Sequence, residues 1–326
     1  MRSKIAYMGW LGHQNIGDEA CFTAIKKMLP KESDITCWDI NPWNKKFRPD
    51  MSIVGGGTLL DLGGDCRVNA IADLRGNAVP TVFWGTGVLG NGKQLSAKTA
   101  ALLNSAEFIG VRGPRSLSRL LSCGIESASV IGDPAFLLTT ARANSYKSDT
   151  VAINIGDARG NLWGTEKAVV TETNVLIKRI TDYGLRVVLF PMWPSDMRYI
   201  NMVDKKVGVI IRPWGKSIAN MMDFMKSCRL VIGMKLHSVV LSAASRTPFV
   251  SIAYREKCLD FAESLDLGGW AVKSDGKHLG NKLFQLLKES ERYTPNIVDK
   301  ITNAYHVYKA AHDNLGARVR KLLKEE

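Results

Sequence analysis

Short apolar runs alternate with helix-like segments along most of the chain, and this alternation constrains the fold more than any other feature. Residues 5–8, 108–111 and 230–232 are apolar runs typical of buried strands. Each precedes a segment in which apolar residues recur every three or four positions, as they do on one face of a helix. Repeated strand–helix units build a parallel sheet with helices on its faces. The sequence therefore predicts an α/β fold.

The alternation breaks near the middle of the chain, at residues 139–149, which are polar and lack an apolar period. We interpret this stretch as a linker between two domains, and 326 residues are enough for both. The prediction is an N-terminal Rossmann-like domain over residues 1–140 and a second one over residues 150–275, facing each other across a cleft. Residues 276–326 form a helical C-terminal segment that is expected to pack back on the domains.

The stretch Ile232-Gly233-Met234-Lys235-Leu236-His237-Ser238 carries the strongest chemical signal. It places a cation, Lys235, and an imidazole, His237, where a buried strand ends and a helical pattern begins. Ligands bind at this edge of open α/β sheets, and helix N-termini attract anions. We therefore expect a site for a small anion with His237 as the proton carrier. The alternatives are a solvated lysine at a helix start and a core histidine.

The N-terminal loop, residues 9–17, joins the first strand to a helix, but it is neither a GxGxxG motif nor a P-loop. Asp18 and Glu19 follow it, and negative charge at a helix start opposes a phosphate there. Sugar hydroxyls suit this end better, with Asn15 and Asp18 as candidate contacts; the alternative is that Asp18 only caps the helix. Three successive glycines, Gly55, Gly56 and Gly57, either let a ligand approach the backbone or make a tight turn.

Composition narrows the class of protein. The net charge of +13 favours acidic partners or a merely soluble basic surface, and its even spread along the chain argues against nucleic acid. The six cysteines form no CxxC pair, which predicts reduced cysteines in a cytoplasmic protein and no zinc site. No apolar stretch approaches the ~20 residues of a membrane span. The sequence carries no signal for an oligomeric state.

Six motifs, taken in order, resemble the polysaccharide pyruvyl transferase family over roughly residues 5–260. They are GWLGHQNIGDEA (9–20), VGGGTLLD (54–61), WGTG (84–87), VRGPRS (111–116), IGDPA (131–135) and IGMKLHSVVLSAASRTPFVSIAYREK (232–257). The resemblance implies a GT-B-like fold of two Rossmann-like domains. It also implies transfer of a pyruvyl group from phosphoenolpyruvate to sugar hydroxyls, giving a pyruvate ketal and phosphate. Phosphoenolpyruvate is then a co-substrate, and no nucleotide sugar, metal or other cofactor is implied.

The resemblance also assigns roles to residues of the donor side. The family's Arg-Leu-His matches Lys235-Leu236-His237, with lysine in place of arginine, so the charge is kept and the planar fork is lost. His237 is the expected proton donor. Arg112 matches a family arginine that binds the donor, with a structural salt bridge as its alternative, and Arg115 is the second choice. Tyr254, Arg255 and Lys257 fall in a motif near the donor and are secondary candidates.

The acceptor is expected against the N-terminal domain. Asn15, Asp18 and the glycines Gly55, Gly56 and Gly57 would bind its hydroxyls, and Asp18 would act as a general base, with His13 as an alternative. Four tryptophans are candidates for a sugar-stacking platform or, equally, for core packing: Trp10, Trp84, Trp193 and Trp214.

The expected partner is a cell-surface glycan or its lipid-linked oligosaccharide precursor. The basic, amphipathic C-terminal segment suits contact with anionic lipid at the inner membrane face, although packing back on the domains is favoured because apolar stripes usually face a core. Two other functions share the predicted fold. They are a glycosyltransferase that uses a nucleotide sugar and a sugar-binding protein that has lost catalysis.

Overall fold

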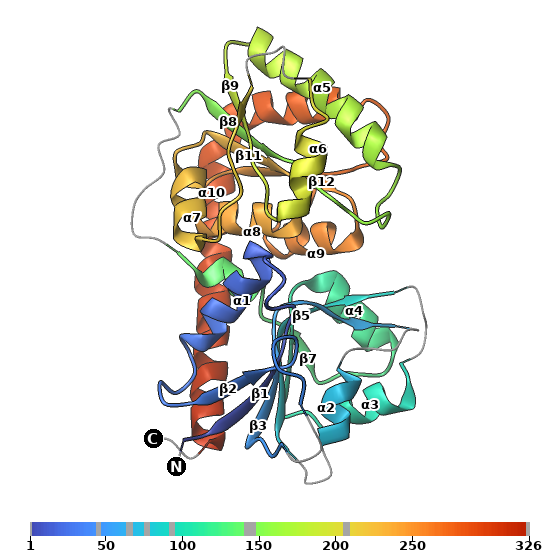
Figure 1. Ribbon diagram of the computed structural model, residues 1–326, viewed down its shortest axis with the longest axis vertical. Coiled ribbons are helices and arrows are strands. Elements are labelled where there is room, and N and C mark those ends of the chain that lie inside the picture. The colour runs from blue at the N-terminus through green and yellow to red at the C-terminus, as the bar shows by residue number, and fades with distance from the viewer. Residues whose placement is uncertain are drawn as a thin grey trace. The chain divides into compact units, whose positions relative to one another are not determined.

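The computed structural model describes residues 2–43, 47–62, 68–74, 79–90, 95–139, 148–204 and 209–323. The chain divides into two compact units, each a parallel sheet covered by helices (Figure 1). Unit 1 comprises Met1–His13, Asp18–Leu137 and His306–Glu326, and unit 2 comprises Gln14–Gly17 and Leu138–Tyr305. Most of the predicted linker, residues 140–147, lies outside the described residues, as does Cys66.

The sheet of unit 1 has the strand order β2-β1-β3-β5-β6-β7, with β4 paired to β5, and every pair is parallel. Its strands are β1 (Lys4–Met8), β2 (Asp34–Cys37), β3 (Met51–Val54), β4 (Gly57–Asp61), β5 (Thr81–Leu89), β6 (Phe108–Val111) and β7 (Ala128–Val130). Its helices are α1 (Ile16–Lys26), α2 (Asn69–Leu74), α3 (Ala97–Asn104), α4 (Pro114–Ser122) and the short 3₁₀ helix η2 (Pro134–Leu137). Of α1, Ile16 and Gly17 belong to unit 2.

The triple glycine does more than end a strand. Gly55 and Gly56 separate β3 from β4, and Gly57 begins β4 with a φ of +97°. A Cβ on Gly55 would lie 2.0 Å from the hydroxyl of Tyr7, and one on Gly56 would lie 2.6 Å from the sulfur of Cys21. These glycines are therefore required by packing within unit 1. Their expected contact with an acceptor stays a prediction.

The sheet of unit 2 has the order β10-β9-β8-β11-β12-β13, again entirely parallel. Its strands are β8 (Thr150–Asn154), β9 (Arg186–Leu189), β10 (Ile210–Ile211), β11 (Leu230–Gly233), β12 (Phe249–Ala253) and β13 (Ala271–Lys273). Its helices are α5 (Glu166–Asp182), α6 (Met197–Ile200), α7 (Ile218–Lys226), α8 (Leu236–Ala244) and α9 (Glu256–Ser264), with short 3₁₀ helices η3 (Pro194–Asp196) and η5 (Gly268–Trp270).

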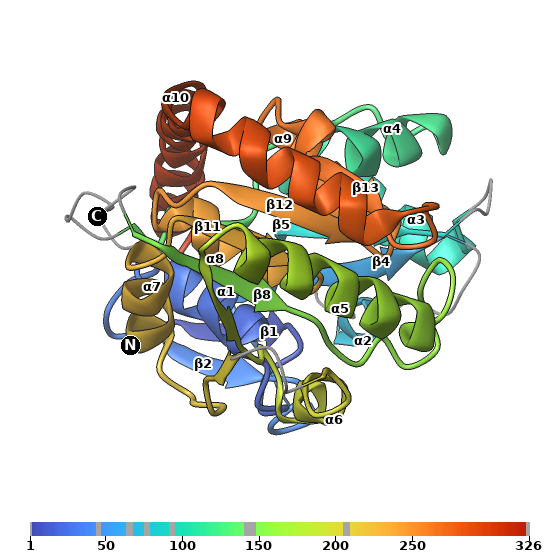
Figure 2. The same ribbon diagram turned by 90° about the horizontal axis from the view of Figure 1, so that it is seen from above.

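The direction of winding reverses in unit 2 between β8 and β11, which are neighbours in the sheet. The chain runs outward through β9 and β10 on one side and through β12 and β13 on the other. Helix α5 and the first part of α10 lie on one face of the sheet, whereas α7, α8 and α9 lie on the other (Figure 1 and Figure 2). Ligands of doubly wound sheets bind where the winding reverses, at the carboxyl ends of the strands.

Helix α10 (Leu279–Leu322) contributes to both units. Ile297 and Ile301 are fully buried in unit 2, and Leu315 and Val319 belong to the core of unit 1 beside β1 and β3. The apolar stripe of this helix is thus used for packing. Among the helices of the described ranges, none combines the length and hydropathy that crossing a bilayer requires.

Candidate functional site

Unit 2 contains a cavity of about 180 Å³ at the carboxyl ends of its central strands. The cavity is lined from the loops after β8, β9, β11 and β12 and by one residue of the N-terminal loop. The lining residues are Asn15, Asp157, Ala158, Arg159, Asn161, Met192, Trp193, Lys235, Leu236, His237, Tyr254, Arg255 and Lys257. The reversal point of the sheet thus carries a pocket rich in cationic side chains.

Lys235 is the N-cap residue of α8, and its backbone is held in place by the side chain of Asn154. Its N–H donates to Oδ1 of Asn154, 2.9 Å away, and the amide of Asn154 donates to the carbonyl of Phe190. Asn154 is fully buried at the end of β8. Its two hydrogen bonds connect the start of α8 to the end of β9. The backbone of the pocket is therefore fixed to the strands of the sheet. Sequence reasoning did not single out Asn154.

The ammonium group of Lys235 is held by two partners inside unit 2. It donates to the carbonyl of Asp157 and lies 3.4 Å from Oδ1 of Asp196. Asp196 is fully buried, and its carboxylate also accepts 3.0 Å hydrogen bonds from the N–H groups of Asp157, Met192 and Trp193. One carboxylate therefore joins the loops after β8 and β9 to the lysine of α8.

Burial raises the pKa of the Asp196 carboxyl group, while the Lys235 ammonium and the backbone N–H donors act in the opposite direction. Gly156 makes room for this arrangement, because a Cβ there would lie 2.1 Å from Oδ1 of Asp196 and 2.7 Å from Cε of Lys235. The sequence does not single out Asp196 as a site residue. The signal it did contain is an aspartate two residues after Pro194, which places a carboxylate in the first turn of η3.

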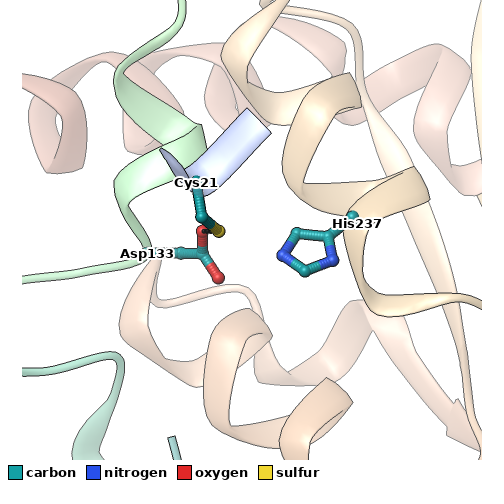
Figure 3. A group of neighbouring side chains, drawn as sticks. All are labelled: Cys21, Asp133 and His237. Carbon is teal, nitrogen blue, oxygen red and sulfur yellow. Dashed lines mark hydrogen bonds between the residues drawn. The ribbon is translucent and has the colours of Figure 1, made fainter. Parts of the chain in front are cut away.

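His237 lies in the first turn of α8, and its side chain is drawn in Figure 3. The segment Gln14–Gly17, which belongs to unit 2, packs against it. A Cβ on Gly17 would lie 2.0 Å from Nδ1 of His237, so only glycine fits beside the ring in this position. The N–H of Ile16 donates to the carbonyl of Met192 at 3.4 Å, which attaches the same segment to the loop after β9.

Three cations of the pocket, Arg159, Lys235 and Lys257, lie over aromatic rings. The guanidinium of Arg159 lies 4.3 Å from the ring centroid of Trp193, and the Lys235 ammonium lies 5.5 Å from it. Lys257 lies 5.0 Å from the ring of Tyr254, whose pKa is raised by burial. The Trp193 ring therefore organises cations, which makes it a poor platform for a sugar.

One cavity contains the expected donor residues that follow the predicted linker. It also contains one residue that was expected on the acceptor side. Lys235, Leu236 and His237 line one cavity with Tyr254, Arg255 and Lys257. Asn15, which was expected to bind hydroxyls on the acceptor side, lines the same cavity.

The other expected site residues belong to unit 1. Arg112 follows β6 and is fully buried, with its guanidinium against Gly87 of β5. Arg115 lies in the first turn of α4. Both remain predicted donor ligands that do not line the pocket of unit 2.

Asp18 lies in the first turn of α1 and so does not cap it from outside. A Cβ on Gly57 would lie 3.1 Å from its carboxylate, so Asp18 and the glycine turn lie side by side in unit 1, and their binding of an acceptor stays a prediction. Close by on the same helix, the thiol of Cys21 donates to Oδ1 of Asp133 at 3.4 Å, also within unit 1 (Figure 3). Burial raises the pKa of that thiol, which keeps it protonated.

Two of the remaining aromatic candidates are used structurally within unit 1. Trp84 is fully buried and donates to Nδ1 of His312 at 2.7 Å. Trp10 stacks on His13, with 4.2 Å between ring centroids, and His13 in turn lies 3.8 Å from the carboxylate of Asp39.

The family model for polysaccharide pyruvyl transferase matches residues 15–256. The chain belongs to this family. The matched region includes Asn15 and ends just after the loop that carries Tyr254 and Arg255, so it spans the residues that line the pocket except Lys257. No curated protein matches the chain in sequence.

Solved structures establish the fold across the whole chain. A UDP co-structure of MnaA from S. aureus aligns with a TM-score of 0.61 at 13% identity, covering 99% of this chain and 97% of the other. The UDP-GlcNAc 2-epimerase of Neisseria meningitidis, bound to UDP-GlcNAc, aligns with a TM-score of 0.61 at 11% identity and covers both chains completely (100% each). The glycotransferase of kitacinnamycin gives 0.58 at 11% identity, with 98% and 99% covered. The fold is GT-B-like, with two Rossmann-like domains, as predicted.

Proposed function

We propose that this protein transfers a pyruvyl group from phosphoenolpyruvate to two hydroxyls of a sugar in a cell-surface polysaccharide or its lipid-linked precursor. The observation that carries the proposal is the pocket of unit 2, which combines Arg159, Lys235 and Lys257 with His237 at the start of α8. Phosphoenolpyruvate is a small anion with a carboxylate and a phosphate. Fixed cations and a helix N-terminus are the groups that bind such a molecule.

The size of the pocket supports a small donor. About 180 Å³ falls below the ~300–1,000 Å³ of pockets for drug-sized ligands. The solved structures named above include proteins bound to UDP and UDP-GlcNAc, which makes a nucleotide sugar the alternative donor. Calorimetry with phosphoenolpyruvate and with UDP-sugars separates the two proposals. Binding of UDP-sugars without binding of phosphoenolpyruvate would refute the pyruvyl assignment.

The proposed reaction requires one proton transfer to carbon. His237, as imidazolium, donates a proton to the methylene carbon of phosphoenolpyruvate, and the first sugar hydroxyl adds to the adjacent carbon as it loses its proton to a base, with Asp18 as the candidate. The C–O bond to phosphate then breaks, the second hydroxyl adds, and its proton leaves with the phosphate group. The products are a ketal with a new methyl group and hydrogen phosphate. No cofactor other than phosphoenolpyruvate as co-substrate enters this scheme.

Phosphate release tests the role of His237. Without a positioned acid, His237→Gln should lower the rate of phosphate release in the presence of acceptor glycan on the order of 100- to 10,000-fold. His278 is exposed, lies in unit 2 and has a φ of +57°, so His278→Asn is a matched control that should keep the rate. Unchanged turnover in His237→Gln would rule out its role as general acid. Mass spectrometry of the glycan should show the added ketal with the wild type.

A further inference from the structure

Asn15 belongs to a short segment, Gln14–Gly17, that is part of unit 2 although the residues on both sides of it are part of unit 1. Asn15 lines the cationic pocket with Lys235 and His237. The question is what an amide contributes there.

The orientation of the amide is fixed by its own backbone. The N–H of Gly17 donates to the Asn15 side chain at 3.0 Å. A backbone N–H is a donor only, so the atom that faces it must be the amide oxygen. The NH₂ group of Asn15 is therefore not used by Gly17 and is the hydrogen-bond donor that this side chain can offer to a ligand in the cavity that Asn15 lines.

The segment that carries Asn15 is itself anchored within unit 2. Ile16 donates to the carbonyl of Met192, and Gly17 packs so closely on His237 that a Cβ would lie 2.0 Å from Nδ1. The position of the amide is therefore tied to the imidazole and to the loop after β9. A group fixed in this way binds a ligand without first having to be ordered.

We propose that Asn15 binds the anionic donor through its NH₂ group and so belongs to the phosphoenolpyruvate side of the site, not to the acceptor side. This inference rests on the proposed function. The neighbours in the cavity, Arg159, Lys235, Arg255 and Lys257, also offer donors to an anion. An NH₂ group adds a directed hydrogen bond without adding charge.

Two substitutions separate the NH₂ group from the local structure. Asn15→Asp keeps the shape and the oxygen that accepts from Gly17, and aspartate is as good a helix cap as asparagine. It replaces the NH₂ group by a negatively charged oxygen. Asn15→Ser keeps a capping oxygen and introduces no charge. If Asn15 had only a structural role, both variants should bind phosphoenolpyruvate as the wild type does.

The measurement is calorimetric titration of the full-length protein with phosphoenolpyruvate. Loss of one hydrogen bond to a charged ligand should weaken binding about tenfold or more in Asn15→Ser, and added repulsion should bring Asn15→Asp to about 100-fold or more. Asn174→Asp is the matched control. Oδ1 of Asn174 likewise accepts a backbone N–H, from Asp204 at 3.0 Å, on helix α5 and outside the pocket. It should bind with unchanged affinity.

A second readout observes the amide itself. In a protein labelled with ¹⁵N at asparagine, the side-chain NH₂ signal that disappears in Asn15→Asp should shift when phosphoenolpyruvate is added to the wild type. Wild-type affinity in Asn15→Asp, or an unmoved NH₂ signal at saturation, overturns the assignment of Asn15 and leaves the proposed function intact. Absence of phosphoenolpyruvate binding to the wild type overturns the proposed function and, with it, this assignment.

Discussion

The ammonium group of Lys235 lies 3.4 Å from Oδ1 of Asp196, and the two residues come from different loops at the edge of the same sheet. Asp196 is fully buried and Lys235 nearly so, with 13% of its side chain exposed. Water screens such a pair weakly, so each charge depends on the other. The carboxylate also accepts backbone hydrogen bonds from two loops, which makes it the main organiser of the pocket wall.

Replacing this carboxylate by an amide should destabilise the protein. In Asp196→Asn one acceptor oxygen must serve three backbone N–H groups, and Lys235 loses its buried counter-charge. Breaking a buried pair by removing one partner is expected to lower the free energy of unfolding by about 3 kcal/mol. Urea denaturation followed by circular dichroism measures the loss.

Asp182→Asn is the matched control, because Asp182 pairs with Lys178 at 2.8 Å on the exposed side of α5. An exposed pair of this kind contributes about 0.5 kcal/mol or less, so the control should remain close to the wild type. Equal stability of Asp196→Asn and the wild type would show that the backbone hydrogen bonds hold the loops without the charge.

The sequence predicts where Lys235 and His237 lie in the fold because their arrangement is local. A strand, a glycine and a helix in succession place Lys235 and His237 at one sheet edge wherever the rest of the chain goes. The positions of Asp196 and Asn154 in the site could not be predicted in this way, because their contacts depend on β8 lying between β9 and β11. The sequence does single out Asn15 but assigns it to the acceptor side, because the residues that flank the segment Gln14–Gly17 belong to unit 1.

Two features of the fold were not expected from the sequence. Strand β4 is short, begins with a glycine at positive φ and pairs with β5 through a shift in register between Thr58 and Leu60, so no regular alternation marks it. The amphipathic pattern of α10 predicts a helix but carries no information on which core it serves. The structure shows that Ile301 and Val319 are buried in different units.

Lys235 can be tested directly for binding of the anionic donor. Lys235→Met removes the charge while keeping most of the side-chain length, and affinity for phosphoenolpyruvate should fall about tenfold or more. Lys235→Arg restores the residue expected from the family motif and supplies a fork that can serve both Asp196 and the ligand. Its affinity should stay within a few-fold of the wild type. If Lys235→Met bound phosphoenolpyruvate normally, the lysine would be a structural partner of Asp196 only.

Gly17→Ala should damage the site through His237. Alanine normally favours a helix over glycine by about 1 kcal/mol, but here its Cβ would lie 2.0 Å from Nδ1 of the imidazole. The ring must move, so phosphate release should fall at least tenfold while the circular dichroism spectrum stays native. Gly215→Ala in unit 2 is the control, because no atom of the described residues, apart from its two chain neighbours, lies within 4 Å of a Cβ at that position. Full activity in Gly17→Ala would mean that the ring position does not matter.

The buried pair of Trp84 and His312 predicts a dependence of stability on pH. Burial lowers the pKa of His312 from 6.5 to about 4. Its Nδ1 accepts the hydrogen bond from Trp84, so a proton added there would break that bond. The folded protein therefore binds this proton less readily than the unfolded chain does.

It follows that the stability contributed by neutral His312 is complete above pH 6.5 and is lost as the pH falls toward 4. The difference between the two pKa values corresponds to about 3 kcal/mol of unfolding free energy. His312→Gln keeps an acceptor for Trp84 but cannot be protonated, so its unfolding free energy should fall less than that of the wild type between pH 7 and pH 4. His306→Gln, exposed on the same helix, should follow the wild type. Parallel curves for His312→Gln and the wild type would mean that other groups set the acid sensitivity of unit 1.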